Sequence, residues 1–194
     1  MSPERSHASN LVLIGPMGAG KTHIARELAT RFGLRLVDID REIEADTGTS
    51  VAALFESEGE AGFRARERAL LAQTLAGDGL VVATGGGAVL DPDNRRLLHA
   101  RGFVVHLHVS VEDQLQRLAH DRSRPLLARG DREQVLRDLA TLREPMYRET
   151  AHLRFDTGLH PAGDVAARLA LVLESHWATA HEAAGATALT GHSS

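Results

Sequence analysis

The chain has 194 residues, a length typical of one domain, and 43% of them are hydrophobic, enough for a full core. A formal net charge of −4 argues against nucleic-acid and membrane-surface binding, and the absence of cysteine excludes disulfides, cysteine-ligated zinc and thiol catalysis. No run approaches the roughly 18 apolar residues of a membrane span, and residues 1–10 lack the apolar stretch of a signal peptide. We therefore expect a cytoplasmic globular protein.

Apolar segments alternate along the chain with segments of helical periodicity. Strands are predicted at residues 11–14, 34–40, 80–83, 103–109 and 152–157. Helices are predicted at residues 21–32, 60–76, 94–100, 111–120, 133–142 and 162–177. Residues 1–10 are predicted to be a flexible leader, and residues 178–194, rich in Ala, Thr, Gly and His, a disordered tail.

This alternation predicts an α/β fold for residues 11–177, with a five-stranded parallel sheet covered by helices on both faces. In such a sheet, ligands bind beyond the carboxyl ends of the strands. The segments GPMGAGKT (15–22), VDID (37–40) and TGGG (84–87) each lie at the carboxyl end of a predicted strand. We expect these three segments to converge on one rim of the sheet.

Residues 15–22 match the phosphate-binding pattern G-x-x-x-x-G-K-[ST] in full. The glycines allow left-handed backbone conformations that bring N–H groups around an anion, and the following helix directs its positive end to the same point. Lys21 is expected to reach the β- and γ-phosphates of a nucleotide, and the Thr22 hydroxyl to ligate Mg²⁺. Lys21 is the only lysine of the chain, and a flexible ammonium fits between phosphates where a planar guanidinium does not. The alternative is a glycine-rich turn with a chance Lys-Thr pair.

Asp38 and Asp40 are two residues apart on the second predicted strand, so their side chains are expected to share one face. One carboxylate can hold Mg²⁺ through water, and the other can accept a proton or a hydrogen bond from an attacking hydroxyl. The alternative is that Asp40 caps the helix beginning with the sequence REIE.

Three glycines, at positions 85–87, follow the third predicted strand, as they would where backbone touches a ligand or where a turn is flexible. Arg64 and Glu67 form an i, i+3 pair, which is a surface salt bridge on most helices. Arg143 precedes Glu-Pro and is either solvated or one of two arginines, with Arg64, that converge on a carboxylate.

Residues 121–131, DRSRPLLARGD, have neither helical nor strand periodicity and carry Arg122, Arg124 and Arg129. This segment is either a solvated charged loop or a mobile lid whose arginine closes over the phosphate during transfer.

Taken together, the motifs resemble the shikimate kinase family over residues 11–175. The resemblance rests on GPMGAGKT, DID, GEAGFRARE, TGGGAV, RPLL and REPMY, in this order and spacing. It implies a P-loop kinase with a nucleoside-monophosphate-kinase-like sheet, which transfers the γ-phosphoryl group of ATP to the 3-hydroxyl of shikimate. It further implies Mg²⁺ as the cofactor, ATP, ADP and shikimate as the ligands, and a monomer.

The resemblance also implies a role for each matching residue. Lys21, Asp40 and Arg124 are implied to be catalytic, with Asp40 as the base and Arg124 as the lid arginine. Thr22 and Asp38 are implied to hold the metal. Nucleotide contacts are implied for Gly18, Ala19, Gly20, Lys21, Thr22, His23, Arg117 and Arg124. Substrate contacts are implied for Asp40, Arg64, Glu67, Gly85, Gly86, Gly87 and Arg143.

The chain departs from the family's pattern in small ways. Thr22 stands where Ser is commoner, and His23 where Ser or Thr is usual. Near adenine the family often has a basic or polar residue, whereas this chain reads GLHP at residues 158–161, with His160 as the candidate.

Two other functions are compatible with parts of the pattern. A kinase for another small polyol or sugar acid, such as gluconate, would share the phosphate loop, but a carboxylate-bearing ring explains two arginines better. A ligand-sensing protein that kept the fold is the other alternative, and measurable turnover would exclude it.

Overall fold

The computed structural model describes residues 9–121, 125–127, 131–161 and 163–177. The predicted leader up to residue 8, the predicted tail and most of the predicted lid, with Arg122, Arg124 and Arg129, lie outside these residues. In the described part, five parallel strands form one sheet in the order β2-β3-β1-β4-β5. The predicted fold class is therefore confirmed.

The strands are β1 (Asn10–Ile14), β2 (Arg35–Asp38), β3 (Leu80–Ala83), β4 (Gly102–His108) and β5 (Leu153–Asp156). The helices are α1 (Lys21–Phe32), α2 (Ile39–Thr47), α3 (Val51–Thr74), α4 (Pro92–Arg101), α5 (Val111–Arg117), α6 (Arg132–Thr150) and α7 (Val165–His176). Two short 3₁₀ helices are η1 (Ala88–Leu90) and η2 (Pro125–Leu127). None of these helices combines the length and apolar composition needed to cross a membrane.

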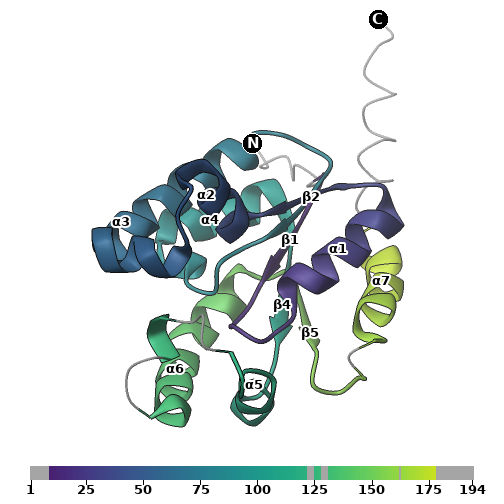
Figure 1. The fold of residues 1–194 in the computed structure, drawn as a ribbon. Helices are drawn as coiled ribbons and strands as arrows, with labels where there is room; N and C mark the ends of the chain where they lie inside the picture. The colour runs from purple at the N-terminus through teal and green to yellow at the C-terminus, as the bar shows by residue number, and fades with distance from the viewer. Residues whose placement is uncertain (1–8, 122–124, 128–130, 162, 178–194) are drawn as a thin grey trace, which may run out of the picture.

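Helices cover both faces of the sheet, as Figure 1 shows. Successive side chains of a strand point to opposite faces, so Leu11 and Leu13 of β1 pack in one apolar cluster and Val12 and Ile14 in another. The first cluster is closed by α1 and α7, and the second by α2, α3, α4 and α6. This two-sided burial explains why the inner strands β1 and β3 are almost entirely apolar, whereas the edge strands β2 and β5 carry charged residues.

The second strand is shorter than predicted. It ends at Asp38, whose side chain accepts a hydrogen bond from the Arg41 backbone N–H and so caps α2. Asp40 lies in the first turn of that helix. The prediction that both aspartates share a strand face was therefore wrong, and the cap of this helix is Asp38 rather than Asp40.

Two helices are longer than predicted. Helix α3 begins at Val51 rather than at residue 60, and Gly59, with φ 73° and ψ 176°, introduces a kink between its two halves. Helix α6 continues through Pro145 to Thr150, beyond the predicted end at residue 142. The extension is important because it carries Arg143 and Tyr147 toward the sheet.

His106 lies in β4 with no exposed surface, and neither ring nitrogen has a hydrogen-bond partner among the described residues. Burial, more than any other cause, lowers its pKa to about 3. The charged and titratable groups around it are His108, Arg154, Lys21, Arg148 and, 3.7 Å from Nε2, Glu144 Oε2. A pKa this low keeps the buried His106 ring neutral in the folded protein near neutral pH.

We expect the protein to lose stability as the pH falls from 6.5 toward 3, because the unfolded chain takes up a proton on His106 that the folded chain does not. One such proton contributes a slope of up to about 1.4 kcal/mol per pH unit.

The variant His106→Phe keeps a ring but cannot titrate. Urea unfolding at pH 7 and pH 5 should show the stability difference between variant and wild type shifting by about 2 kcal/mol in favour of the variant at the lower pH. His152, whose pKa is lowered to about 4 mainly by burial, acts equally in both proteins. If the stability of variant and wild type fell equally between pH 7 and pH 5, the pH dependence could not be assigned to His106.

Candidate active site

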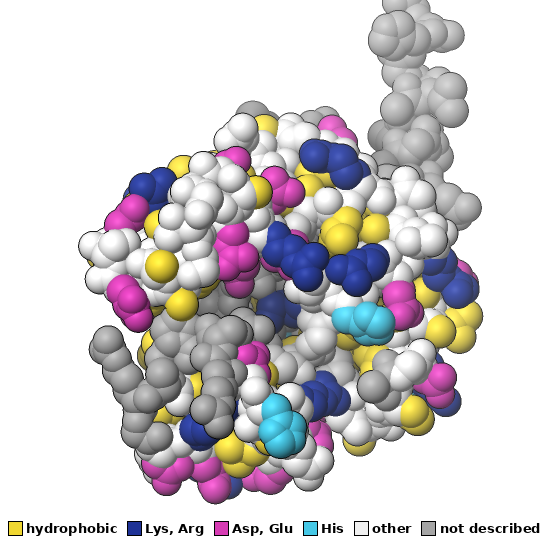
Figure 2. Space-filling model, viewed as in Figure 1, with side chains coloured by type: hydrophobic (Ala, Val, Ile, Leu, Met, Phe, Trp, Pro, Cys, Tyr) yellow, Lys and Arg dark blue, Asp and Glu magenta, His cyan; other side chains and the backbone are white. Residues whose placement is uncertain are grey.

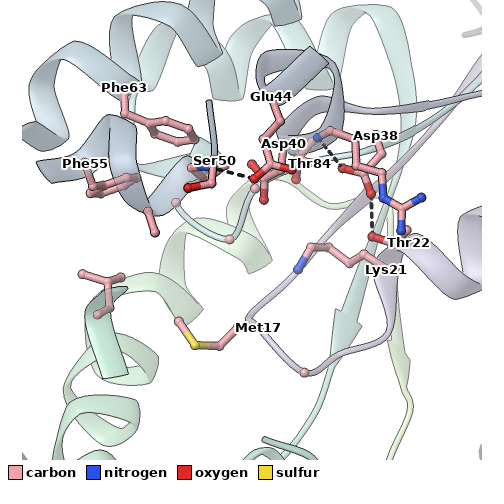
Figure 3. A pocket seen from close by; sticks show the side chains of 18 of the residues that line it. Met17, Lys21, Thr22, Asp38, Asp40, Glu44, Ser50, Phe55, Phe63 and Thr84 are labelled. Atoms are coloured by element: carbon pink, nitrogen blue, oxygen red, sulfur yellow. Dashed lines mark hydrogen bonds between the residues drawn. The ribbon is translucent and has the colours of Figure 1, made fainter. Parts of the chain in front are cut away.

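A cavity of about 890 Å³ opens at the carboxyl end of the sheet. Figure 2 shows this hollow in the face of the molecule, with basic side chains along its edge, and Figure 3 shows it from close by. The three predicted segments converge here, as expected. The predicted residues that line the cavity are Gly18, Gly20, Lys21, Thr22, His23, Asp38, Asp40, Arg64, Gly85, Gly86, Gly87 and Arg143.

The loop between β1 and α1 has the backbone that its glycines allow. Gly18 and Gly20 adopt left-handed conformations, with φ 78° and 85°. A side chain at Gly15 would lie 2.4 Å from the Leu107 carbonyl oxygen, so the loop can approach β4 only with glycine there. Ala19 is fully buried beneath the loop and does not line the cavity.

The Lys21 ammonium bends back over the loop. It donates hydrogen bonds to the carbonyl oxygens of Gly15, at 2.8 Å, and Pro16, at 2.9 Å. In Figure 3 its side chain extends from the start of α1 into the cavity. The ammonium therefore lies where a phosphate group held by the loop would meet it.

Thr22 and Asp38 form a pair of oxygen donors at the base of the loop. The Thr22 hydroxyl donates to Asp38 Oδ2 at 2.5 Å. Hydroxyl and carboxylate oxygens are the ligands that Mg²⁺ prefers, and this ion usually takes only one or two groups from the protein, with phosphates and water completing its shell. The pair therefore fits a Mg²⁺ bound together with nucleotide.

Asp40 is half-buried and lines the same cavity although it stands on helix α2. The backbone turns from strand to helix between Asp38 and Asp40, and both carboxylates nevertheless reach the site (Figure 3). A carboxylate in this position can accept a proton from a hydroxyl that occupies the cavity.

Arg64 stands on helix α3, and its guanidinium packs against the glycine triplet. Its Nη1 donates to Glu67 Oε2 at 2.7 Å, and its guanidinium lies 5.3 Å from the Phe63 ring centre. A side chain at Gly87 would lie within 2.1 Å of Arg64 Nη2, so glycine is required for this approach. The arginine side chain is 19% exposed and lines the cavity.

Glu67 has no exposed surface, so the alternative of an ordinary surface salt bridge is wrong. Its Oε1 has no hydrogen-bond partner among the described residues and points at Gly85, where a side chain would lie 2.5 Å away. Desolvation raises the pKa of Glu67, while the charges of Arg64 and Arg143 act against the shift and that of Asp40 adds to it. Glu67 stands behind the cavity wall rather than in it.

Arg143 is 5% exposed, so the alternative of a solvated arginine is also wrong. It projects from α6 into the cavity, and its Nη1 lies 3.5 Å from the point that a Gly86 side chain would occupy. Arg64 and Arg143 therefore stand against successive residues of the glycine triplet. Two guanidinium groups in this arrangement can hold one carboxylate.

Of the other residues expected near the nucleotide, His23 lines the cavity, whereas Arg117 and His160 do not. Arg117 donates from Nη1 to the Gly18 carbonyl and to Thr157 Oγ1, both at 3.0 Å, and so connects the phosphate loop to the segment after β5. His23 is 62% exposed and lies 3.0 Å from Glu27. The His160 ring packs against Phe155, with ring centres 5.4 Å apart.

Several lining residues were missed. Met17, Glu44, Ser50, Phe55 and Thr84 all face the cavity, as Figure 3 shows. Ser50 caps α3 by accepting from the Ala53 N–H, a capping signal that the sequence offered. Phe63, which is 2% exposed, also lines the site.

Comparison with known proteins shows which family this chain matches. The family model described as shikimate kinase matches residues 17–174. A shikimate kinase from Stenotrophomonas maltophilia (strain R551-3) is 58% identical over 170 residues, covering 88% of this chain and 94% of the relative. One from Xanthomonas oryzae pv. oryzae (strain PXO99A) is 52% identical over the same share of both chains.

Solved structures agree with the sequence matches. The shikimate kinase from Acinetobacter baumannii in complex with shikimate has a TM-score of 0.83 and 46% identity, with 87% of this chain and 94% of that chain covered. The shikimate kinase from Aquifex aeolicus has a TM-score of 0.74 and 29% identity, with 86% and 97% covered.

Proposed function

The chain belongs to the shikimate kinase family, and on that premise we propose that it transfers the γ-phosphoryl group of ATP to the 3-hydroxyl of shikimate. The products are shikimate 3-phosphate and ADP, a step toward chorismate and the aromatic amino acids. The observation that carries this proposal is the pairing of a phosphate loop with two buried or half-buried arginines in one cavity. The loop fits ATP, and the arginines fit an acceptor that bears a carboxylate.

The chemistry needs little covalent help from the protein. Phosphoryl transfer passes through a loose transition state, so positioning and positive charge supply most of the rate enhancement. We assign Lys21 to the phosphates, and Arg64 and Arg143, which stand against the glycine triplet, to the substrate carboxylate. Asp40 orients the attacking hydroxyl and accepts its proton. Arg124, outside the described residues, is assigned to the phosphates as the lid arginine.

Thr22 and Asp38 are assigned to hold Mg²⁺, because their oxygens meet at the base of the loop. A Mg²⁺ ion held by these residues would neutralise part of the charge on the nucleotide phosphates. Thr22 and Asp38 would hold the ion directly or through water, in place of their mutual hydrogen bond. Glu67 is assigned a supporting role, because its carboxylate holds Arg64 from behind.

A coupled assay of ADP release, with shikimate, gluconate or no acceptor, tests the proposed reaction. We expect turnover with shikimate, little with gluconate and only slow ATP hydrolysis without acceptor. We expect this because the two arginines hold the carboxylate of the acceptor. Only shikimate has a rigid ring that then fixes the position of the reacting hydroxyl. Turnover with gluconate at the shikimate rate would reject the proposed specificity, and no acceptor-dependent release would reject the reaction.

The single lysine gives a second test of the nucleotide site. The chain has two kinds of primary amine, Lys21 and the N-terminal α-amine. We expect an acylating reagent to modify both in the free protein, and saturating Mg·ATP to suppress only the Lys21 adduct, because phosphates cover and charge-pair the ammonium. Peptide mapping measures both sites, and the α-amine is the internal control. Acylation of Lys21 at the same rate with and without nucleotide would contradict its place in the phosphate site.

We also propose that the enzyme acts as a cytoplasmic monomer. Light scattering during gel filtration should give a mass near the chain's 20.9 kDa. A mass of twice that value would reject the monomer.

A further inference from the structure

We propose that Tyr147 is a positioning residue for the acceptor, whose phenol fixes the Gly86 backbone and Arg143 in the arrangement that receives the carboxylate. This inference rests on the proposed function. Tyr147 was not among the residues expected from the sequence to belong to the site, and it does not line the main cavity. It acts through its neighbours.

The Tyr147 hydroxyl contacts the site at the Gly86 backbone and also interacts with the Arg143 side chain. It donates a hydrogen bond of 2.5 Å to the carbonyl oxygen of Gly86, the middle residue of the glycine triplet. The side chain is 2% exposed, so this bond is shielded from competing water. Burial raises the pKa of Tyr147 to about 12, so the phenol remains a donor at every pH at which the enzyme would work.

Gly86 is a junction between the two halves of the site. The point that a Gly86 side chain would occupy lies 3.5 Å from Arg143 Nη1, 3.5 Å from the Gly15 carbonyl oxygen and 3.6 Å from the Met17 nitrogen. Its backbone is thus packed between the carboxylate-binding arginine and the phosphate loop. A shift of the Gly86 peptide would therefore move Arg143 and change the distance between Arg143 and the phosphates.

Arg143 depends on such neighbours for its orientation. Arg143 is almost completely buried, with 5% of its surface exposed. Its Nε nevertheless has no hydrogen-bond partner among the described residues. Tyr147 follows it by one helical turn on the same face of α6, where i and i+4 side chains meet. One helix therefore presents both the arginine and the phenol that anchors the peptide beside it.

The Tyr147 ring is itself held firmly. It stacks on His106 of β4, with ring centres 4.9 Å apart and an angle of 24° between the planes. The surrounding apolar cluster includes Ile14, Val104 and Leu98. Packing alone would be satisfied by phenylalanine, so the hydroxyl is explained by its bond to Gly86.

The variant Tyr147→Phe tests the inference, because it removes the hydroxyl and keeps the ring. We expect the KM for shikimate to rise by about five- to tenfold, as for a lost buried hydrogen bond, while the KM for ATP and kcat stay within twofold. Thr150→Val is the matched control. It removes a buried hydroxyl from the same helix, one that donates to the Met146 carbonyl away from the site, and it should leave all three constants unchanged.

The readout separates positioning from a loss of stability. Partial unfolding lowers the amount of active enzyme and hence the maximal rate, but it does not change KM. An unchanged KM for shikimate in Tyr147→Phe would therefore overturn the inference even if the variant were less stable. An equal rise in Thr150→Val would also overturn it.

A second measurement asks whether Tyr147 acts through Arg143. In an Arg143→Ala background, adding Tyr147→Phe should change the KM for shikimate by less than twofold, because the group being positioned is gone. A five- to tenfold rise in the KM for shikimate in that background would show that Tyr147 does not act through Arg143. Wild-type turnover of shikimate is measured first. Its absence would reject the proposed function, whereas turnover with an unaltered KM in Tyr147→Phe rejects only the inference.

Discussion

Replacing Asp40 with asparagine should lower kcat for shikimate by about 10²–10⁴-fold, the contribution of a positioned general base. Asparagine has the shape of aspartate but cannot accept the proton of the attacking hydroxyl. Nucleotide binding should be nearly unchanged, because Lys21, Thr22 and Asp38 keep their contacts. Turnover assays measure the rate, and calorimetry with Mg·ADP measures the binding.

The control for Asp40→Asn is Asp46→Asn, which changes the same residue type on the same helix at an exposed position. We expect this variant to match the wild type in kcat and in ADP affinity. If Asp40→Asn turned over within a few-fold of the wild type, the carboxylate would serve only the first turn of α2, where acidic side chains are favoured.

Replacing Arg64 with alanine should weaken shikimate binding by about 2–5 kcal/mol, as expected when one member of a buried charge pair is truncated. ATP affinity should be nearly unchanged, because the contacts of Arg64 are with α3 and Gly87 rather than with the phosphate loop. The variant should also be less stable, since Glu67 would be left fully buried without its 2.7 Å ion pair. Calorimetry on the folded variant measures the affinity, and urea unfolding measures the stability.

Arg66 on the same helix provides the matched control. It is exposed and pairs with Glu58, which is also at the surface. Arg66→Ala should bind shikimate normally and lose little stability, because exposed ion pairs contribute little. Normal shikimate binding by Arg64→Ala would show that the carboxylate is held elsewhere.

The elements best predicted from the sequence are those with local boundary signals. Helix α1 has the predicted limits, 21–32, because left-handed glycines stand at both of its ends, at Gly20 and Gly33. Strand β3 matches at 80–83 as a continuous apolar run. The boundaries that failed depend on less obvious features, such as the Asp38 cap that ends β2 early and the kink at Gly59 that lets helix precede residue 60.

In the site, the sequence was sufficient to bring three motifs together but not to say how deeply each side chain is buried. An Arg-Glu pair at i, i+3 has the same spacing on a surface as in an interior, and only the fold places Glu67 against Gly85 and away from water. Tyr147 was not expected in the site although the REPMY motif ends on it, because its partner, the Gly86 carbonyl, lies 61 positions away in the chain. The catalytic and binding roles themselves remain predictions.

The glycine triplet has a consequence for how the protein can change under selection. Every amino-acid replacement of glycine adds a Cβ atom, and at positions 85 and 87 that atom would meet Glu67 at 2.5 Å and Arg64 at 2.1 Å. At Gly163, by contrast, no atom lies within 4 Å, so replacements there are tolerated sterically. An inhibitor that takes its hydrogen bonds from the backbone of residues 85 and 87 would therefore face positions where any replacement must displace the Glu67 or the Arg64 side chain, which the site itself uses.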